Sequence, residues 1–315
     1  MKYLFIVNAE AGKGRADETA VPAIRRYFEN HPELSWEIVH TSAPGDAGDL
    51  ARQAAEQGKE VTIFACGGEG TAFEIVNGIY GFDNVCLGVV PCGSANDFLR
   101  AFGEKSRSAF LDLPNQMAGK ECRMDLIRAD EFYCLNGCSV GMDAIIARDM
   151  ALFKRWPLVN GSLAYILSIV KTFCGKIGVD IGVSMDNGPF VRQNRLFAVI
   201  TNGPAYGGGF LSAPKAVPWD GVLNFAQVKT ISKRLIPGFL KKYHGGNHED
   251  LPYCRVGTCT TMDFVSDKPV PVNLDGEIVE RTKMHFELVP SALRFLVPAS
   301  LADSVPACRT AKAKI

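Results

Sequence analysis

Glycine and small polar residues gather in one short segment whose composition suits the binding of phosphate groups. Gly67-Gly68-Glu69-Gly70-Thr71 follows the apolar run at residues 61–66 and opens a helical pattern over residues 71–80. Glycine lacks a Cβ atom, so the backbone can approach an anion closely, and free N–H groups at a helix start can donate to phosphate oxygens. The hydroxyl of Thr71 can cap the helix or donate a hydrogen bond to a phosphate oxygen. The segment predicts a phosphate-binding turn between a strand and a helix.

Two better-known phosphate motifs do not fit the chain. The third glycine of a dinucleotide fingerprint is missing, because the segment reads G-x-G-x-x-F from Gly68. The loop at residues 8–15 holds the pair Gly12-Lys13, but it lacks the upstream glycine of a P-loop and continues with Gly14-Arg15. This loop can still contribute to a nucleotide site from a neighbouring strand end.

A third loop, Cys92-Gly93-Ser94-Ala95-Asn96-Asp97, follows the apolar run at residues 87–90. The three loops follow strand-like segments that alternate with helical patterns, which predicts βαβ units and a doubly wound parallel sheet. Loops that follow parallel strands meet at the carboxyl edge of the sheet, where such folds bind ligands. The first third of the chain therefore predicts an α/β nucleotide-binding domain.

From about residue 124 the pattern changes to frequent short strands of period two, separated by turns such as Asp186-Asn187-Gly188-Pro189. This pattern predicts a mainly antiparallel β domain of the sandwich type with a few helices. The strands are expected at residues 123–128, 132–138, 179–185, 197–201, 223–228, 260–265 and 284–289, and the helices at 143–153, 162–174 and 232–243.

Length and composition limit the class of protein. A chain of 315 residues favours two domains, and equal numbers of basic and acidic residues (34 each) give no indication of nucleic-acid binding. The apolar runs at residues 3–7 and 163–170 are too short for a signal segment or a membrane span. We expect a cytoplasmic protein whose membrane contact is peripheral.

Ten cysteines occur without a single CxxC pair, and in the absence of an export signal we expect all of them to be reduced. The alternative is a metal site built from His244, His248, Cys254 and Cys259. Their spacing fits no zinc pattern, and Gly245-Gly246 argues against a shared helical face.

The loop motifs resemble those of a known family. GGEGT at residues 67–71, FEIVNG at 73–78 and GVVPCGSANDFLR at 88–100 closely resemble the diacylglycerol kinase catalytic-domain family, which includes bacterial lipid kinases and sphingosine kinases. The first loop looks like the family's N-P-x-[SA]-G segment, with Ala9 in place of proline. The resemblance implies an ATP site formed by Asn8, Ala9, Glu10, Ala11, Gly12, Thr41, Gly67, Gly68, Glu69, Gly70, Thr71, Ala72, Phe73, Ser94 and Asn96.

The resemblance continues into the second half. Residues 213–223 look like the family's A-P-x-A-x-x-x-D-G-x-L segment, which implies Mg²⁺ bound by Asp220 and by the carbonyls of Val217 and Val222. Asp275-Gly276-Glu277 is similar to the family's DGE motif and implies Glu277 as the catalytic base, with Glu69 as the second acidic candidate.

Three departures from the family pattern stand out: Glu69 replaces aspartate, Ser94 replaces threonine, and Trp219 stands at a position that is often polar. On the resemblance alone, a Glu69→Asp change restores the family's residue and is expected to retain or raise activity.

Taken together, the resemblance implies an ATP- and Mg²⁺-dependent lipid kinase with a nucleotide domain at residues 1–127 and 290–315 and a lipid-substrate domain at 128–289. Two alternatives stay open: an NAD kinase-like enzyme, and a catalytically weak nucleotide- or lipid-binding regulator. The lipid, the nucleotide preference and a homodimeric state are also open. Basic residues beside apolar ones favour anionic headgroups, although a solvated face is the simpler explanation of these charges. The basic residues are Lys154 and Arg155, beside Trp156, and Lys233, Arg234, Lys241 and Lys242.

Overall fold

The computed structural model describes residues 2–12, 14, 16–93, 96–103, 105–154, 156, 159, 161–303 and 305, so the predicted site residue Ser94 and the basic residue Arg155 lie outside the described residues. The chain forms two compact units. The first comprises Met1–Leu126, Pro218–Asp220 and Val289–Ile315, and the second comprises Ile127–Val217 and Gly221–Leu288.

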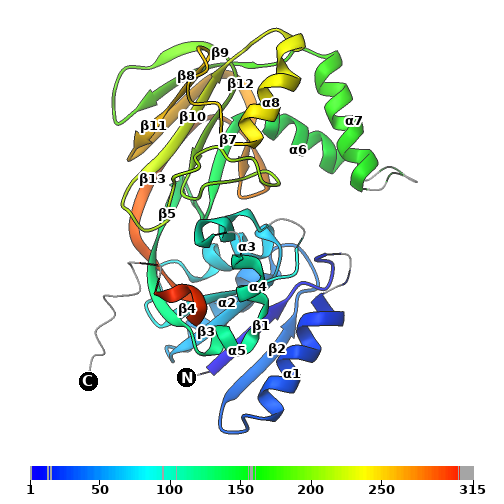
Figure 1. The fold of residues 1–315 in the computed structure, drawn as a ribbon, viewed down its shortest axis with the longest axis vertical. Coiled ribbons are helices and arrows are strands. Elements are labelled where there is room, and N and C mark those ends of the chain that lie inside the picture. Colours follow the sequence, from blue (N-terminus) through cyan, green and yellow to red (C-terminus); the bar gives the residue numbers. More distant parts are fainter. Residues whose placement is uncertain are drawn as a thin grey trace. The chain divides into compact units, whose positions relative to one another are not determined.

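The first unit contains a parallel sheet (Figure 1). The strand order is β2-β1-β3-β4, and all three pairings are parallel. The final part of β13 (Glu277–Val297) adds a further parallel pairing to β4, with Phe295 opposite Leu87. The bounds are β1 (Lys2–Val7), β2 (Ser35–His40), β3 (Val61–Gly67) and β4 (Val85–Pro91). Every residue of β3 and β4 is buried, as expected of strands covered on both faces.

Helices connect these strands. The main ones are α1 (Val21–Glu29), α2 (Asp46–Ala55) and α3 (Glu69–Ile79). Shorter segments complete the unit: a π-helical turn at Ala16–Ala20, a 3₁₀ helix η2 at Asp97–Phe102, α4 (Ser106–Leu111), α5 (Leu113–Met117) and α9 (Ala299–Ala302). The helix predicted from residue 71 begins two residues earlier, which places Glu69 and Gly70 in its first turn.

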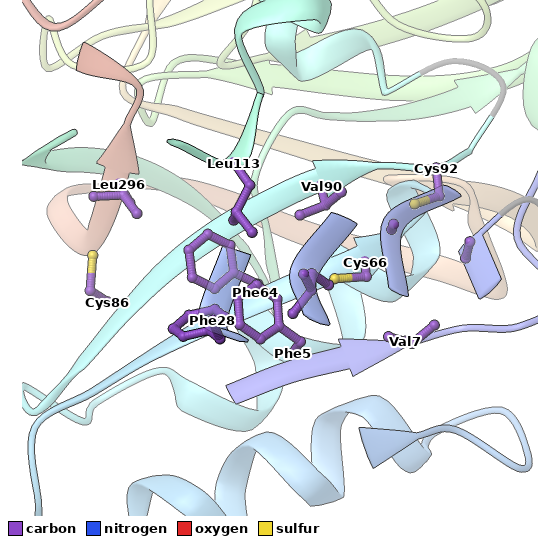
Figure 2. Packing of buried hydrophobic residues seen from close by; sticks show 13 residues of the cluster. Phe5, Val7, Phe28, Phe64, Cys66, Cys86, Val90, Cys92, Leu113 and Leu296 are labelled. Carbon is purple, nitrogen blue, oxygen red and sulfur yellow. The ribbon is translucent and has the colours of Figure 1, made fainter. Parts of the chain in front are cut away.

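Apolar residues of alternate strand positions pack on one face of the sheet (Figure 2). The ring of Phe5 stacks on that of Phe64 with 4.5 Å between centroids, and α1 contributes Phe28 to the same cluster. On the opposite face α2 and α3 approach so closely that a Cβ atom on Gly78 would lie 2.2 Å from the carbonyl oxygen of Gly48.

The second unit is built on antiparallel strands. The long strands β9 and β12 each pair with β8 at one end and with β7 at the other, while β10 and β11 extend the sheet beyond β9. The strand bounds are β5 (Lys120–Ala129), β6 (Phe132–Cys134), β7 (Gly137–Gly141), β8 (Val179–Met185), β9 (Val191–Thr201), β10 (Leu223–Lys229), β11 (Cys254–Cys259) and β12 (Thr261–Leu274). The helices are α6 (Met142–Phe153), α7 (Gly161–Cys174), the 3₁₀ turn η3 (Lys233–Leu235) and α8 (Ile236–His244).

The strands differ from the prediction in length. Residues 132–138 form two strands instead of one, because the chain turns at Leu135 and Asn136. The predicted strands at 260–265 and 284–289 are parts of the much longer β12 and β13, whose Asp-Gly hairpin turn lies at residues 275–276.

One expectation about the cysteines is wrong. Cys122 is disulfide-bonded, so the ten cysteines are not all reduced. Eight others in the described part of the chain are free thiols, and six of these are buried. No helix among the described residues is long and apolar enough to cross a membrane.

Candidate active site

The loops that follow β1, β2 and β3 are joined by hydrogen bonds at one edge of the first unit's sheet. The amide of Asn8 donates to the carbonyl of Cys66 (3.0 Å), and the amide of Thr41 donates to the carbonyl of Val7 (3.0 Å). The Asn8 side chain donates through Nδ2 to Oγ1 of Thr71 (3.2 Å). The predicted nucleotide residues Asn8, Thr41 and Thr71 therefore come from two loops and the first turn of α3, at one edge of the sheet.

Thr71 is not the helix cap that the sequence allows. The N-cap position of α3 is Gly68, and no side chain caps this helix. Thr71 is buried and lies against Gly67, since a Cβ atom on Gly67 would be 2.3 Å from the Thr71 hydroxyl oxygen. Only glycine at position 67 leaves room for this threonine.

The carbonyl of Gly67 holds the loop that follows β4. It accepts from the amides of Cys92 (3.1 Å) and Gly93 (3.0 Å), and from Nδ2 of Asn96 at 3.4 Å. The two glycine segments are in close contact, because a Cβ atom on Gly93 would lie 2.6 Å from Cα of Gly68. A Cβ atom on Gly68 would meet nothing nearer than 3.8 Å. Gly68 therefore presents an open surface of backbone, whereas Gly93 is enclosed.

Asn96 has the features of a ligand-binding residue. Its φ of 55° is left-handed, a conformation that asparagine tolerates better than most residues. The side chain is buried, and its Oδ1 has no hydrogen-bond partner within the described part of the chain. A buried acceptor without a partner is costly, so a bound amino or hydroxyl group would be stabilised there.

Glu69 connects the glycine turn to the loop that follows β4. Its Oε1 accepts a hydrogen bond from the backbone amide of Asp97 at 2.8 Å, at the start of η2. Asp97 is buried and forms an ion pair with Arg100 (3.3 Å). The carboxylate at position 69 thus has a positional role between two of the predicted nucleotide loops.

The other predicted nucleotide residues fall into two groups. In the first loop the Ala11 amide donates to the Asn8 carbonyl and the Glu10 amide to Asn8 Oδ1, which forms a compact turn ending at Gly12 with φ of 63°. Ala72 and Phe73, by contrast, are buried in the first turns of α3, and the amide of Ala72 already donates to the carbonyl of Gly68.

Two residues that support the site were not identified from the sequence. Arg107 donates to the carbonyls of Pro91 (2.9 Å) and Gly93 (2.6 Å), which fixes the loop that follows β4. Glu74 accepts from the amides of Gly45 (2.9 Å) and Ala47 (3.1 Å) at the start of α2. Glu74 belongs to the FEIVNG segment, which the sequence analysis identified. Its hydrogen-bond partners in α2 could not be predicted from that segment, because they lie far away in the sequence.

The Asp275-Gly276-Glu277 turn lies in the second unit. The Asp275 carboxylate accepts from the amides of Leu135, Asn136 and Gly137, the last at 2.7 Å. Burial raises the pKa of Asp275 to about 6, although these amides act in the opposite direction. Asp275 therefore fixes the turn before β7, while Glu277 is an exposed residue at the start of β13.

The segment predicted to hold Mg²⁺ is a turn in which Gly221 has φ of 77°. Asp220 is exposed and belongs to the first unit, whereas Val217 and Val222 belong to the second. The amide of Asp125 on β5 donates to the carbonyl of Pro218 at 2.8 Å, which ties the turn to the first unit. One carboxylate with backbone carbonyls is a donor set that suits a partly hydrated Mg²⁺.

The alternative zinc site is not formed. Among the described residues no group of three or more His, Cys, Asp or Glu side chains is arranged to hold a metal ion. His248 is fully buried beside Tyr243, and His244 packs against Phe210. Burial lowers the pKa of His248, as expected of a neutral core histidine.

Comparisons with known proteins identify the class of protein. Residues 2–129 match the diacylglycerol kinase catalytic domain, and residues 136–297 match the YegS C-terminal NAD kinase beta sandwich-like domain. The chain belongs to the diacylglycerol kinase catalytic-domain family, with a mixed α/β structure and a C-terminal β-sandwich-like domain.

Individual relatives agree with this assignment. The chain is 27% identical to "Putative lipid kinase YtlR" of Bacillus subtilis, over 93% of this chain and 98% of that protein. It is 28% identical to "Probable lipid kinase YegS-like" of Shewanella frigidimarina, over 74% of this chain and 75% of that protein. The fold is similar to the crystal structure of "a putative diacylglycerol kinase" from Bacillus anthracis, with a TM-score of 0.70 at 22% identity over 95% of this chain and 98% of that chain.

Proposed function

We propose that the protein transfers the γ-phosphoryl group of ATP to a hydroxyl group of diacylglycerol or a similar lipid, with Mg²⁺. The observation that carries this proposal is the carbonyl of Gly67, which binds the loop following β4 beside the open backbone of Gly68. Phosphoryl transfer depends mainly on positioning and on neutralising charge, and backbone amides at a strand-to-helix turn supply both.

Within this proposal the nucleotide is bound by the three strand-end loops, including Ser94, and Gly68 contacts its phosphates. The unpartnered Oδ1 of Asn96 would accept from an amino or hydroxyl group of the nucleotide. Asp220, with the carbonyls of Val217 and Val222, would hold Mg²⁺, which supplies neutralising charge when bound.

Glu277 is the proposed proton acceptor for the lipid hydroxyl. The position of Glu69 supports this choice, because one of its carboxylate oxygens accepts from the Asp97 amide and orders the nucleotide loops. Glu277 is exposed at the start of β13, in the unit to which we assign the lipid. A general base must be able to reach the proton that it removes.

The experiment that tests the function is incubation of the protein with γ-³²P-labelled ATP, Mg²⁺ and a total lipid extract. Label in the organic phase supports the lipid kinase, and mass analysis of the new phospholipid identifies the substrate. In a parallel reaction with NAD⁺ as the acceptor, label in NADP in the aqueous phase would instead favour the NAD kinase-like alternative. Retained ATP binding without any product would favour the regulator.

The same assay separates the two acidic candidates. We expect Glu277→Gln to lower kcat by about 10²–10⁴-fold, which is typical for loss of a positioned base, with unchanged ATP binding. If Glu277→Gln turns over normally while Glu69→Gln binds ATP without turnover, the base is Glu69. An Asp220→Asn protein that keeps its Mg²⁺ dependence would argue against the proposed metal site.

We further propose that the nucleotide domain comprises residues 1–127 and 290–315, and that residues 128–289 bind the lipid at the inner face of the cytoplasmic membrane. The basic residues predicted to contact the membrane are not all available, since Lys233 donates to the carbonyls of Phe173 (2.6 Å) and Gly175 (2.8 Å). Arg234, Lys241 and Lys242 are the remaining members of that group for contact with anionic headgroups.

A further inference from the structure

The first unit contains a cavity of about 420 Å³ between α1, the end of β4 and the short helices α4 and α5. Its lining combines buried residues, which form the floor, with exposed residues at the mouth. The floor residues are Ala20, Ile24, Val90, Leu113 and Gln116, and the mouth residues are Thr19, Ala23 and Leu111. Among the residues that the structure describes, none assigned above to the nucleotide, to Mg²⁺ or to proton transfer lines this cavity.

Gln116 is the polar side chain of this floor. It is fully buried, and its Nε2 donates to the carbonyls of Val89 (3.0 Å) and Phe110 (2.5 Å). These two hydrogen bonds fix the orientation of the amide group. Oε1 of Gln116 is also buried, and it has no hydrogen-bond partner within the described part of the chain. Because an unsatisfied buried acceptor is unfavourable, an N–H or O–H donor of a ligand would be stabilised there.

The rest of the buried lining is mainly apolar. Most of it belongs to the apolar cluster of the first unit (Figure 2), which includes Ala20, Ile24, Val90, Cys92 and Leu113. Burial raises the pKa of the Cys92 thiol to about 11, so this side chain is neutral and acts as a small apolar group. Cavities of about 300–1,000 Å³ are typical of sites for small molecules. Size and lining therefore suit a small molecule that is mainly apolar.

The cavity also adjoins the loop that follows β4, because Pro91, Cys92 and Arg107 belong to its lining. The guanidinium group of Arg107 donates to the carbonyls of Pro91 (2.9 Å) and Gly93 (2.6 Å), so a ligand need not supply an anion for it. On its other side the loop is held by the carbonyl of Gly67, which accepts from the amides of Cys92 and Gly93. A ligand in the cavity would add contacts to this arrangement of the loop.

We propose that this cavity is an effector site for a small, uncharged and mainly apolar molecule that donates one N–H or O–H hydrogen bond to Oε1 of Gln116, and that its occupation strengthens ATP binding. The coupling to ATP rests on the proposed function, whereas the binding of the molecule does not. Coupling between two sites typically changes an affinity by about 5–150-fold, and it is reciprocal. ATP should therefore strengthen binding of the effector by the same factor.

Calorimetric titration of the full-length protein with two pairs of probes tests the site, in the absence of ATP. Indole carries one N–H donor, and benzofuran has a similar size and shape with an acceptor oxygen in its place. Phenol and fluorobenzene form a second pair of this kind. The donor-bearing probe of each pair should bind at least about fivefold more tightly, because its partner leaves the Gln116 acceptor unsatisfied. The proposal is overturned if neither donor-bearing probe binds more tightly than its partner.

Variants of α1 provide a matched pair. Ala23→Phe places a ring at the mouth of the cavity and should weaken indole binding at least tenfold. Arg25→Phe adds the same ring two residues further on, about 200° around the helix, and should leave indole binding unchanged. Both positions are exposed, so the fold should accept both rings. Equal affinities of Ala23→Phe and the unchanged protein would refute the site. Gln116→Met has no amide oxygen and should lose the preference for indole over benzofuran; if this variant does not fold, the probe pairs on the unchanged protein still decide.

The indole titration is then repeated with a saturating non-hydrolysable analogue of ATP. Indole should bind at least about fivefold more tightly in its presence, and the analogue should gain the same factor from indole. Equal indole affinities with and without bound analogue would refute the effector role. The outcome is separable from the proposed function. Phosphorylation of a lipid by a protein that does not bind the donor-bearing probes keeps the kinase and refutes the cavity. Donor-dependent binding of indole by a protein that binds no nucleotide keeps the cavity and refutes both the coupling and the kinase.

Discussion

Shortening Glu69 to aspartate removes one methylene from the side chain that connects the glycine turn to η2. In the structure Oε1 of Glu69 lies 2.8 Å from the amide nitrogen of Asp97. One C–C bond is about 1.5 Å long, so a carboxylate that retreats by most of that length leaves the hydrogen-bonding range of about 2.7–3.2 Å. The Glu69→Asp protein should therefore lose this contact, although aspartate is the residue of the family pattern.

The size of the effect follows from the kind of contact that is lost. A hydrogen bond to a charged acceptor contributes about 1.5–3 kcal/mol, and Glu69 is only half-buried, so we take about 1–2 kcal/mol. If this free energy orders the loop that holds the nucleotide, ATP binding weakens by about 5–30-fold. The fold itself should persist, because the Gly67 carbonyl still accepts from Cys92 and Gly93.

The assay is a calorimetric titration with ATP, together with the thermal midpoint of each protein. Glu69→Gln is the matched control, because it keeps the length and the acceptor oxygen while it removes the charge, and it should bind ATP better than Glu69→Asp. If Glu69→Asp binds ATP as tightly as the unchanged protein, the contact with Asp97 does not order the nucleotide site, and the expectation from the family resemblance is correct.

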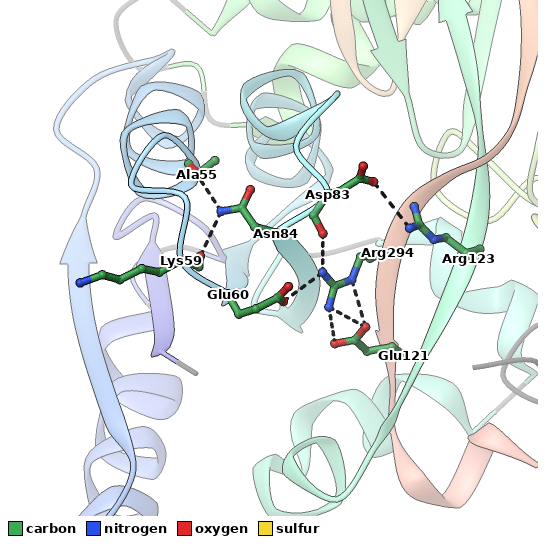
Figure 3. A network of polar contacts seen from close by, with 8 residues as sticks. All are labelled: Ala55, Lys59, Glu60, Asp83, Asn84, Glu121, Arg123 and Arg294. Carbon is green, nitrogen blue, oxygen red and sulfur yellow. Dashed lines mark hydrogen bonds and ion pairs between the residues drawn. The ribbon is translucent and has the colours of Figure 1, made fainter. Parts of the chain in front are cut away.

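Three further predictions follow from contacts in the two units. Gly68→Val should weaken ATP binding at least tenfold with little change in stability, because the new Cβ has room. Gly93→Ala should lower the thermal midpoint, because its Cβ would lie 2.6 Å from Cα of Gly68. Equal thermal midpoints of the two variants would contradict this difference in packing. Arg294→Met should destabilise the first unit by about 1–3 kcal/mol in urea unfolding, since the guanidinium group of Arg294 binds Glu121 and Glu60 (Figure 3). Arg294→Lys should recover only part of this free energy of unfolding, because lysine lacks the planar guanidinium group that binds a carboxylate through two parallel hydrogen bonds. Burial lowers the pKa of His285, but hydrogen bonds and charge interactions with Asp263 and Glu287 outweigh this effect, so the pKa in the folded protein is raised. The protonated imidazole therefore stabilises the fold below pH 6.5, and this contribution is lost as the pH rises above the pKa of His285 in the folded protein. Unfolding at pH 6 and pH 8 should show a smaller difference for His285→Gln than for the unchanged protein, and an equal difference would rule out this linkage.

Local patterns in the sequence were sufficient to predict where the strand-end loops of the first unit lie. Buried strands and the glycine turn occur where the apolar runs and Gly67-Gly68 predict them, because each signal lies within a few residues. The start of α3 was misplaced by two residues, since no side chain caps it and the helix begins directly after Gly68. The lengths of β12 and β13 were underestimated, because charged residues such as Lys268 and Lys283 interrupt the apolar alternation of half-exposed strands.

The hydrogen bonds of Glu74 and Asp275 could not be predicted from the sequence for a different reason. Glu74 binds amides 27 and 29 residues away, and Asp275 binds amides about 140 residues away. An apolar cavity in the second unit likewise combines side chains from α6, α7, α8 and β12. Such contacts depend on which strands and helices become neighbours, and no spacing within one segment encodes that.

These long-range contacts also bear on the assignment of the base among the three motif acids. Asp275 has both carboxylate oxygens in hydrogen bonds to buried backbone amides, so removing a proton from a substrate would compete with the contacts that hold β7. Glu69 accepts from the Asp97 amide, and turning toward a lipid hydroxyl would release the loop that follows β4. Glu277 stands at the exposed start of β13, next to the hairpin turn at residues 275–276. A proton acceptor has to reach its substrate, and the exposed position of Glu277 favours the proposal that it is the base.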